Sequence, residues 1–152
     1  MRQTIARLCS AAPGLLFMLL ATTVVAADES ELRLEISGLA NEEGRVYFSV
    51  YNSEDTWLGE ERVTGAAVDI ADAMEGEIVV ATVKLPPGDY AISIFYDVNA
   101  NGELDTNFIG IPKEPVALSN NAKARFGPPK YKDALFTLPD EGAVQTIEIT
   151  EI

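Results

Sequence analysis

The chain has 152 residues, a formal net charge of −13, one cysteine and no histidine. Hydrophobic residues make up 47% of it and charged residues 23%, a balance typical of a globular protein long enough for one hydrophobic core. The acidity argues against nucleic acid as a partner, because binding phosphate requires a basic surface. The absence of histidine excludes His-based catalytic triads and zinc sites of the HExxH type.

Residues 1–27 have the pattern of a secretory signal peptide. Two arginines precede an apolar stretch centred on residues 15–20, and small residues at 25–27 suit signal peptidase. We therefore expect cleavage before Asp28, a single domain over residues 28–152, and a periplasmic or secreted protein. An uncleaved membrane anchor is the alternative, but the apolar stretch is short for a span, and we expect no transmembrane segment in the mature chain.

Cleavage would change the chemistry available to the protein. It removes two arginines and no acid, so the net charge would fall from −13 to −15. It also removes Cys9, the single cysteine, which excludes disulfides and thiol chemistry from the mature chain. A hydrophobic core, with or without a bound metal, would have to hold the exported domain together.

Short segments of alternating apolar and polar residues predict β-strands, and there is no βαβ rhythm. We expect a hairpin between the first two strands, a less regular connection with a short helical turn over residues 52–74, and a long loop over residues 97–132. The fold class expected is all-β, an antiparallel sandwich of about seven strands with a long loop after the central strand. The strands are expected at residues 32–36, 46–50, 77–85, 90–96, 134–138 and 146–149.

The segment after the central strand carries the spacing of a calcium loop. Oxygen-bearing side chains stand at its positions 1, 3, 5 and 9, a glycine stands at position 6, and position 7 would contribute a backbone carbonyl. Calcium takes six to eight oxygen ligands, which alternate residues of a tight loop supply. The candidate ligands are Asp97, Asn99, Asn101, Glu103 and Asp105.

This loop departs from the usual calcium motif at its twelfth position. Phe108 stands there in place of the bidentate acid, so a replacement would have to come from Asn107, Glu114 or another loop. The expected affinity is weak, with Kd on the order of 10⁻⁴–10⁻³ M, and the expected role is structural. The alternative is a turn rich in Asp and Asn whose side chains cap the backbone without an ion.

Residues 110–136 form a second candidate site, since they concentrate cations and aromatics in an otherwise acidic chain. Such a set suits a protein, a glycan or a small polar ligand. The alternative is a rigid loop whose aromatics plug one end of the sandwich and whose asparagines satisfy backbone groups. The candidate binding residues are Lys113, Glu114, Asn120, Asn121, Arg125, Phe126 and Tyr131.

Several motifs together closely resemble the bacterial domain-of-unknown-function 2141 family. They include Leu85-Pro-Pro-Gly-Asp-Tyr-Ala, the Asp97–Asp105 loop, Gly110-Ile-Pro-Lys-Glu-Pro and Phe126-Gly-Pro-Pro, and the resemblance runs from about Leu32 to Ile149. It implies an exported bacterial protein with a sandwich like that of transthyretin or an immunoglobulin domain. It implies no substrate or reaction.

Three functions remain open from the sequence. The first is a non-enzymatic exported binding module with a structural calcium loop. The second is a periplasmic carrier or sensor of a small molecule, which would use the aromatic and basic residues of 110–136. The third is a hydrolase that uses carboxylates such as Glu114 and Asp133, since paired carboxylates perform acid–base catalysis.

Overall fold

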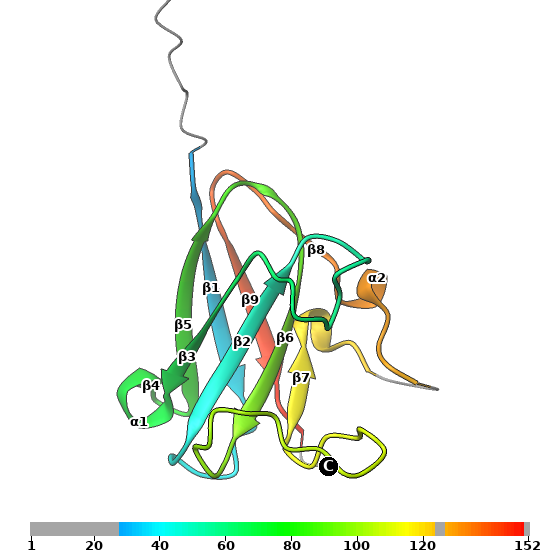
Figure 1. Ribbon diagram of the computed structural model, residues 1–152. Coiled ribbons are helices and arrows are strands. Elements are labelled where there is room, and N and C mark those ends of the chain that lie inside the picture. The colour runs from blue at the N-terminus through cyan, green and yellow to red at the C-terminus, as the bar shows by residue number, and fades with distance from the viewer. Residues whose placement is uncertain (1–27, 124–126, 151–152) are drawn as a thin grey trace, which may run out of the picture.

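The computed structural model describes residues 28–123 and 127–150, which form a sandwich of two β-sheets (Figure 1). The predicted signal peptide lies outside the described residues. The strands are β1 (Ser30–Ser37), β2 (Arg45–Tyr51), β3 (Thr64–Asp69), β4 (Met74–Glu75), β5 (Ile78–Leu85), β6 (Gly88–Asp97), β7 (Val116–Leu118), β8 (Phe136–Leu138) and β9 (Ala143–Glu148). The short helical segments are α1 (Ile70–Ala73), the 3₁₀ turn η1 (Ser119–Asn121) and α2 (Tyr131–Ala134).

The strand order is β4-β5-β1-β9 in one sheet and β3-β2-β6-β7 in the other, with β8 also paired to β6. All pairs are antiparallel except β1 and β9, which run parallel. The predicted all-β sandwich is therefore confirmed, with one parallel pair. The described residues contain nine strands, against about seven expected. The strands that were not expected are β3, β4 and β7, and the last two are only two and three residues long.

The core lies between the two sheets and follows from the alternation seen in the sequence. Each long strand turns every second side chain inward, because successive strand residues point to opposite faces. Burying one large aliphatic side chain contributes roughly 1.5–3 kcal/mol, so these rows hold the sheets together. The inward rows include Leu32, Leu34 and Ile36 of β1, Val46, Phe48 and Val50 of β2, and Ile92, Ile94 and Tyr96 of β6.

The predicted hairpin between the first two strands is wrong, because β1 and β2 belong to different sheets. The connection between them, residues 38–44, crosses from one sheet to the other. At its start Gly38 has φ +79°, and a Cβ there would stand 2.1 Å from the carbonyl oxygen of Ile149. Each of two consecutive amphipathic strands must bury its apolar face. Strands in two sheets that pack face to face meet this need as well as strands paired in a hairpin do, so the alternation alone does not distinguish the two arrangements.

Two segments expected to be irregular contain regular structure. The 52–74 connection holds the predicted short helical turn as α1, but also β3, whose small residues Gly65, Ala66 and Ala67 give no clear alternation. The 97–132 loop is interrupted by β7, η1 and the start of α2. The strand expected at 134–138 begins at residue 136, and the last strand runs over 143–148 where 146–149 was expected.

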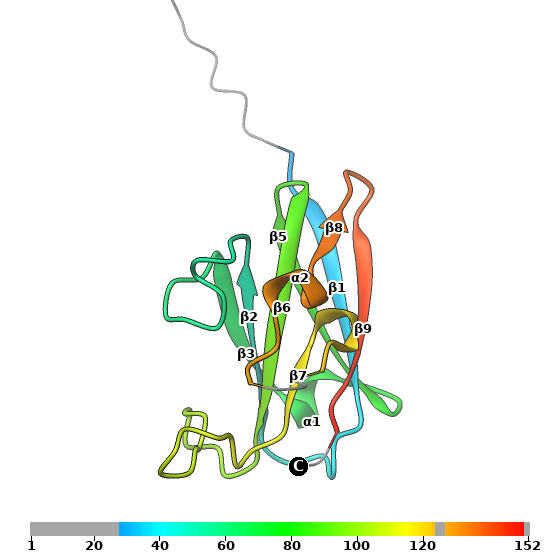
Figure 2. The ribbon, with the colours of Figure 1, turned by 90° about the vertical axis from the view of Figure 1, so that its right-hand side faces the viewer.

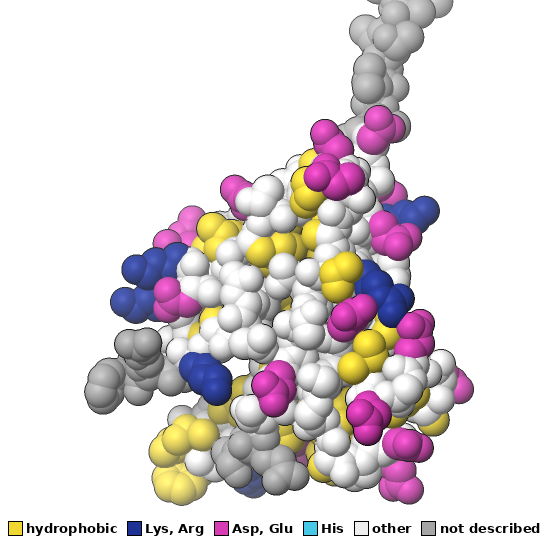
Figure 3. Space-filling model, turned by 180° about the vertical axis from the view of Figure 1, so that it is seen from behind, with side chains coloured by type: hydrophobic (Ala, Val, Ile, Leu, Met, Phe, Trp, Pro, Cys, Tyr) yellow, Lys and Arg dark blue, Asp and Glu magenta, His cyan; other side chains and the backbone are white. Residues whose placement is uncertain are grey.

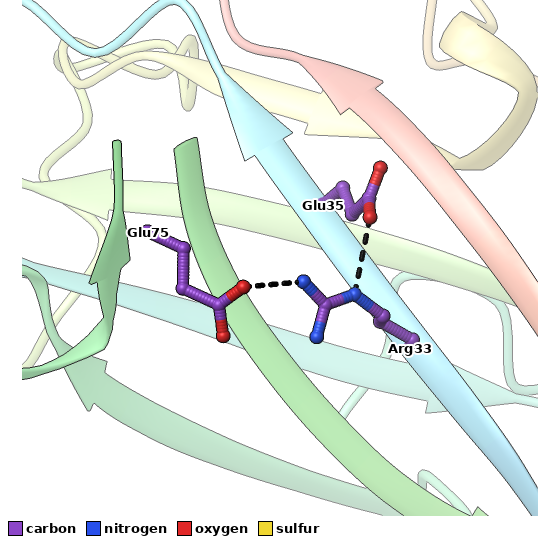
Figure 4. A network of polar contacts seen from close by, with 3 residues as sticks. All are labelled: Arg33, Glu35 and Glu75. Carbon is purple, nitrogen blue, oxygen red and sulfur yellow. Dashed lines mark hydrogen bonds and ion pairs between the residues drawn. The ribbon is translucent and has the colours of Figure 1, made fainter. Parts of the chain in front are cut away.

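The outer face of the β4-β5-β1-β9 sheet carries a polar network centred on Arg33 (Figure 4). Its Nε donates to Glu35 Oε1 at 3.1 Å and its Nη2 donates to Glu75 Oε2 at 2.6 Å. The contact reaches across β5 to hold β4, the short edge strand, in place. All three side chains are solvent-accessible, so their contribution to stability is small.

Two tyrosines of β6 make the fold sensitive to alkaline pH. Burial raises the pKa of the Tyr90 and Tyr96 phenols above the ordinary value of about 10, and the nearby Glu43 charge raises that of Tyr96 further. Tyr90 donates to the Pro86 carbonyl at 2.9 Å.

We expect the free energy of unfolding to fall as the pH rises above about 10. The unfolded chain releases its phenolic protons first, so the stabilisation is complete below that pH and is lost as the pH passes the raised pKa values. Urea unfolding between about pH 8 and about pH 11 measures this. Replacing both residues with Phe should flatten the pH dependence, and an unchanged slope in that variant would contradict the assignment.

Candidate functional site

The connection between β6 and β7, residues 98–115, forms a long loop at one end of the sandwich (Figures 1 and 2). It starts from Asp97, the last residue of β6, whose side chain is completely buried. Asp97 Oδ1 accepts from the Asn101 amide at 3.2 Å, and Oδ2 accepts from the Gly102 amide at 2.8 Å. Gly102 has φ +84°, which permits this tight turn. The buried carboxylate therefore bends the chain back over the strand end.

The two asparagines of the predicted calcium motif extend the same turn. Asn99 Oδ1 accepts from the Asn101 amide at 3.0 Å, and Asn101 Oδ1 accepts from the Glu103 amide at 2.7 Å. Their side-chain NH₂ groups both donate to Asp105 Oδ2, at 2.8 Å from Asn99 and 3.5 Å from Asn101. Three of the five predicted side chains thus meet, while the Asp97 carboxylate contacts only the backbone of the same turn. The Glu103 side chain is exposed, which leaves its backbone carbonyl as its possible contribution.

Glu114 closes the base of the loop. Its side chain is 5% exposed; Oε1 accepts from the Val98 amide and Oε2 from the Asp105 amide, each at 3.1 Å. The Lys113 amide donates to the Asp105 carbonyl at 2.8 Å. The residue named as a possible replacement for the missing twelfth ligand therefore links both ends of the nine-residue motif. Sixteen residues separate it from Val98, so only the folded loop brings them together.

The arrangement satisfies its buried charges with backbone donors. A buried carboxylate without partners is costly, whereas one that accepts two N–H bonds is compensated. In the part of the chain that the structure describes, no group of three or more His, Cys, Asp or Glu side chains is placed to hold a metal. Any cation in this loop would therefore depend on amide and carbonyl oxygens beside the carboxylates.

The end of the loop forms a small hairpin that presents apolar side chains to solvent. A β-bridge joins Thr106 and Pro112, and Asn107 caps the turn between them. We call the residues at its end, Phe108–Ile111, the apolar tip. Phe108 is 98% exposed, Ile109 64% and Ile111 51%. The sequence analysis treated Phe108 only as a missing ligand. The signal in the sequence that could have predicted an exposed hairpin is the apolar run Phe108–Ile111 between the turn-forming residues Asn107 and Pro112.

The asparagines of the second candidate site are engaged with the backbone. Asn120 Nδ2 donates to the Leu135 carbonyl at 2.7 Å, and Asn121 Oδ1 accepts from the Glu148 amide at 2.8 Å. Both have positive φ values, 57° and 50°, a conformation that Asn tolerates better than most residues. They tie η1 to β9 and to the residue between α2 and β8, which is the role that the alternative expectation described.

Tyr131 packs at the side of the sandwich. Its ring meets Trp57 edge to face at 5.7 Å, and the Trp57 Nε1 donates to the Pro129 carbonyl at 2.9 Å. Burial raises the pKa of the Tyr131 phenol. Tyr131 starts α2, at mid-height on the sandwich, whereas Lys113 belongs to the loop at its lower end (Figure 1). Arg125 and Phe126 lie outside the described residues.

The described surface includes two shallow hollows. One, of about 190 Å³, is lined by Asn52, Thr56, Glu61, Arg62 and Val63. The other, of about 360 Å³, is lined by Glu31, Arg33, Glu141, Gly142, Ala143 and Val144. Neither is lined by residues of the two candidate sites.

These features define a two-sheet β-sandwich with an ordered, Asp- and Asn-rich loop after its central strand. Residues 34–147 match the family described as "Uncharacterized protein conserved in bacteria (DUF2141)", and the chain belongs to this family. No curated protein and no solved structure matches the chain, so the likeness to transthyretin or immunoglobulin domains stays a prediction. Among the described residues, none of the helices has the length and apolar character needed to span a membrane.

Replacing Glu114 with Gln should destabilise the loop, because one oxygen becomes an NH₂ group that faces a backbone N–H. We expect a loss of about 1–3 kcal/mol in the free energy of unfolding, and faster hydrogen exchange at the Val98 and Asp105 amides. Glu103→Gln is the matched control, since its side chain is exposed, and should change stability by less than about 0.5 kcal/mol. Equal effects of the two substitutions would contradict the conclusion that the hydrogen bonds of Glu114 stabilise the base of the loop.

Proposed function

We propose that this protein is a non-enzymatic exported binding module that contacts its partner through the β6–β7 loop. The observation that carries the proposal is the apolar tip, with Phe108 98% exposed on a hairpin held by backbone hydrogen bonds. Side chains this apolar remain in water at a cost, and such exposed groups mark interaction sites. Export to the periplasm or cell exterior is part of the proposal and is supported by the pattern of residues 1–27.

The base of the loop supports a contact surface of fixed shape. Asp97 and Glu114 each accept two backbone N–H bonds, and both side chains are buried. The Asp105 carbonyl accepts from the Lys113 amide across the neck of the hairpin. Because the loop is ordered before it meets a partner, binding costs less conformational entropy.

We propose further that calcium braces this loop. The supporting features are the motif spacing, the Asn99 and Asn101 side chains that meet Asp105, and the nearby Glu114 carboxylate. Each amide oxygen of the asparagines keeps a second lone pair beyond its hydrogen bond. A cation would neutralise carboxylates that the loop gathers, and it would supply stability that the mature chain cannot obtain from disulfides.

The carrier and the hydrolase have weaker support. The two hollows described above are shallow and Tyr131 lines neither of them, so neither favours a small-molecule site that uses that residue. Both oxygens of Glu114 accept backbone N–H groups, whereas Asp133 is exposed on α2. A carboxylate with both oxygens engaged is poorly available for proton transfer, and we therefore favour the binding module.

Calcium titration followed by thermal unfolding tests the brace. With Kd on the order of 10⁻³ M, calcium at about ten times that concentration should add about 1.4 kcal/mol of stability and raise Tm by a few degrees. Asp105→Asn should abolish the shift, because it removes one of the two carboxylates of the motif. Glu103→Gln should keep it.

Magnesium is the control ion, since it demands a tighter octahedral geometry than this loop offers. No shift with calcium at these concentrations, an equal shift with magnesium, or a full calcium shift in Asp105→Asn would each overturn the calcium proposal. The bare turn, in which side chains alone cap the backbone, would then describe the loop.

A further inference from the structure

Exposed apolar side chains concentrate on one segment of the molecule. Among the described residues, six of the nine exposed large hydrophobic side chains lie between residues 98 and 116. Figure 3 shows hydrophobic side chains projecting at the lower end of the molecule, the end at which Figure 1 places the β6–β7 loop. Neither hollow described above is lined by residues of the tip, so the tip projects from the surface. The six residues are Val98, Leu104, Phe108, Ile109, Ile111 and Val116.

Most backbone N–H groups of the hairpin end are hydrogen-bonded within the hairpin itself. Asn107 Oδ1 accepts from the Ile109 and Ile111 amides, each at 3.0 Å. The Asn107 carbonyl accepts from the Gly110 amide at 3.0 Å, and the Asn107 amide donates to the Ile111 carbonyl at 2.8 Å. Pro112 carries no N–H. Backbone groups satisfied internally are the main requirement for entering lipid, where an unpaired group costs several kcal/mol.

The charges near the tip match a zwitterionic lipid surface. Residues 106–112 include no charged side chain, and Lys113 follows directly, exposed at the neck of the hairpin. Its ammonium group suits a lipid phosphate, in the way that flanking lysines anchor membrane segments at the interface. The net charge, −13 for the full chain and −15 for the processed chain, gives no long-range attraction to anionic lipid, so insertion must depend on the apolar residues.

The size of the hairpin also fits. Three residues separate the Thr106–Pro112 bridge from the end of the turn, which corresponds to roughly 10 Å of extended chain. Apolar groups of peripheral proteins enter the headgroup and acyl boundary by about 5–10 Å. A second copy of the chain is a poorer occupant, since each of the two hollows described above carries a glutamate and an arginine in its lining.

We infer that the apolar tip inserts into the interfacial region of a zwitterionic phospholipid bilayer, with Lys113 at the headgroup level. The inference names the partner of the contact surface put forward under the proposed function and rests on it. It does not require calcium, because the hydrogen bonds of Asn107 order the tip separately from the Asp97–Asp105 turn.

Co-sedimentation with phosphatidylcholine vesicles tests this on the processed chain from Asp28, which contains the whole sandwich. We expect measurable binding at about 1 mM lipid, and a loss of at least about tenfold in partitioning for the double variant Phe108→Ser with Ile109→Ser. Val144→Ser is the matched control, since Val144 is 54% exposed on β9, away from the tip. Thermal melts of the double variant should match the parent, because its two sites are exposed.

A fluorescent reporter gives a second measurement that needs no loss of binding. The processed chain has no cysteine, so Ile109→Cys and Val144→Cys each accept one environment-sensitive label. The label at 109 should shift to shorter wavelength on adding vesicles, and the label at 144 should not. Both experiments are run with calcium and with a chelator, so they test membrane insertion even if the loop does not bind calcium.

The insertion is overturned by any of three results: no sedimentation with phosphatidylcholine vesicles, equal sedimentation of the double variant, or no difference between the two labels. Binding that appears only with anionic or cationic lipid would also overturn it, since electrostatics would then replace insertion. If the tip variants lose a purified protein partner while vesicles are not bound, the occupant is a protein and the inference is wrong.

Discussion

The buried carboxylate of Asp97 is the constraint on which the rest of the loop depends. It stands where β6 leaves the core, completely removed from solvent, and a charge in that position must find donors. The amides of Asn101 and Gly102 supply them, which forces the chain to turn at once. Glu114 repeats the arrangement from the other end of the loop by accepting from the Val98 and Asp105 amides. The loop therefore takes the shape in which its backbone N–H groups replace water around two buried carboxylates.

The position of β6, the strand that carries Asp97, explains why the exposed β6–β7 loop has a fixed shape. β6 is the longest strand, and near its end Asp97 pairs with Arg45 of β2 while Phe95 pairs with Val116 of β7. The loop leaves from that end and returns directly into β7, which pairs with β6 again. A hairpin supported at both ends by the same strand can hold apolar side chains in water without collapsing onto the sandwich. This is the property expected of a preformed contact surface.

Much of the fold was predictable because its signals are local. Alternation identified β1, β2 and β6, since a strand with one buried face must change polarity at every residue, and a run of β-branched residues identified β5. Partner choice was not predictable from the same signal. The inward faces of β1 and β2 suit a hairpin as well as opposite layers, and the sandwich selects the second. The strands β3 and β7 were missed because one consists largely of small residues and the other spans three residues, Val116–Leu118, within a Pro-rich stretch.

By itself, the sequence determined which side chains face the core and that residues 97–105 form a turn rich in Asp and Asn, because these features depend on near neighbours along the chain. Only the tertiary structure decided that Glu114 closes the base of that turn, that Asn121 joins η1 to β9, and that Phe108 stands in solvent. Each of these facts depends on contacts between residues far apart in sequence or on the absence of such contacts. Local patterns carry no information about them, since the packing of the two sheets sets those distances.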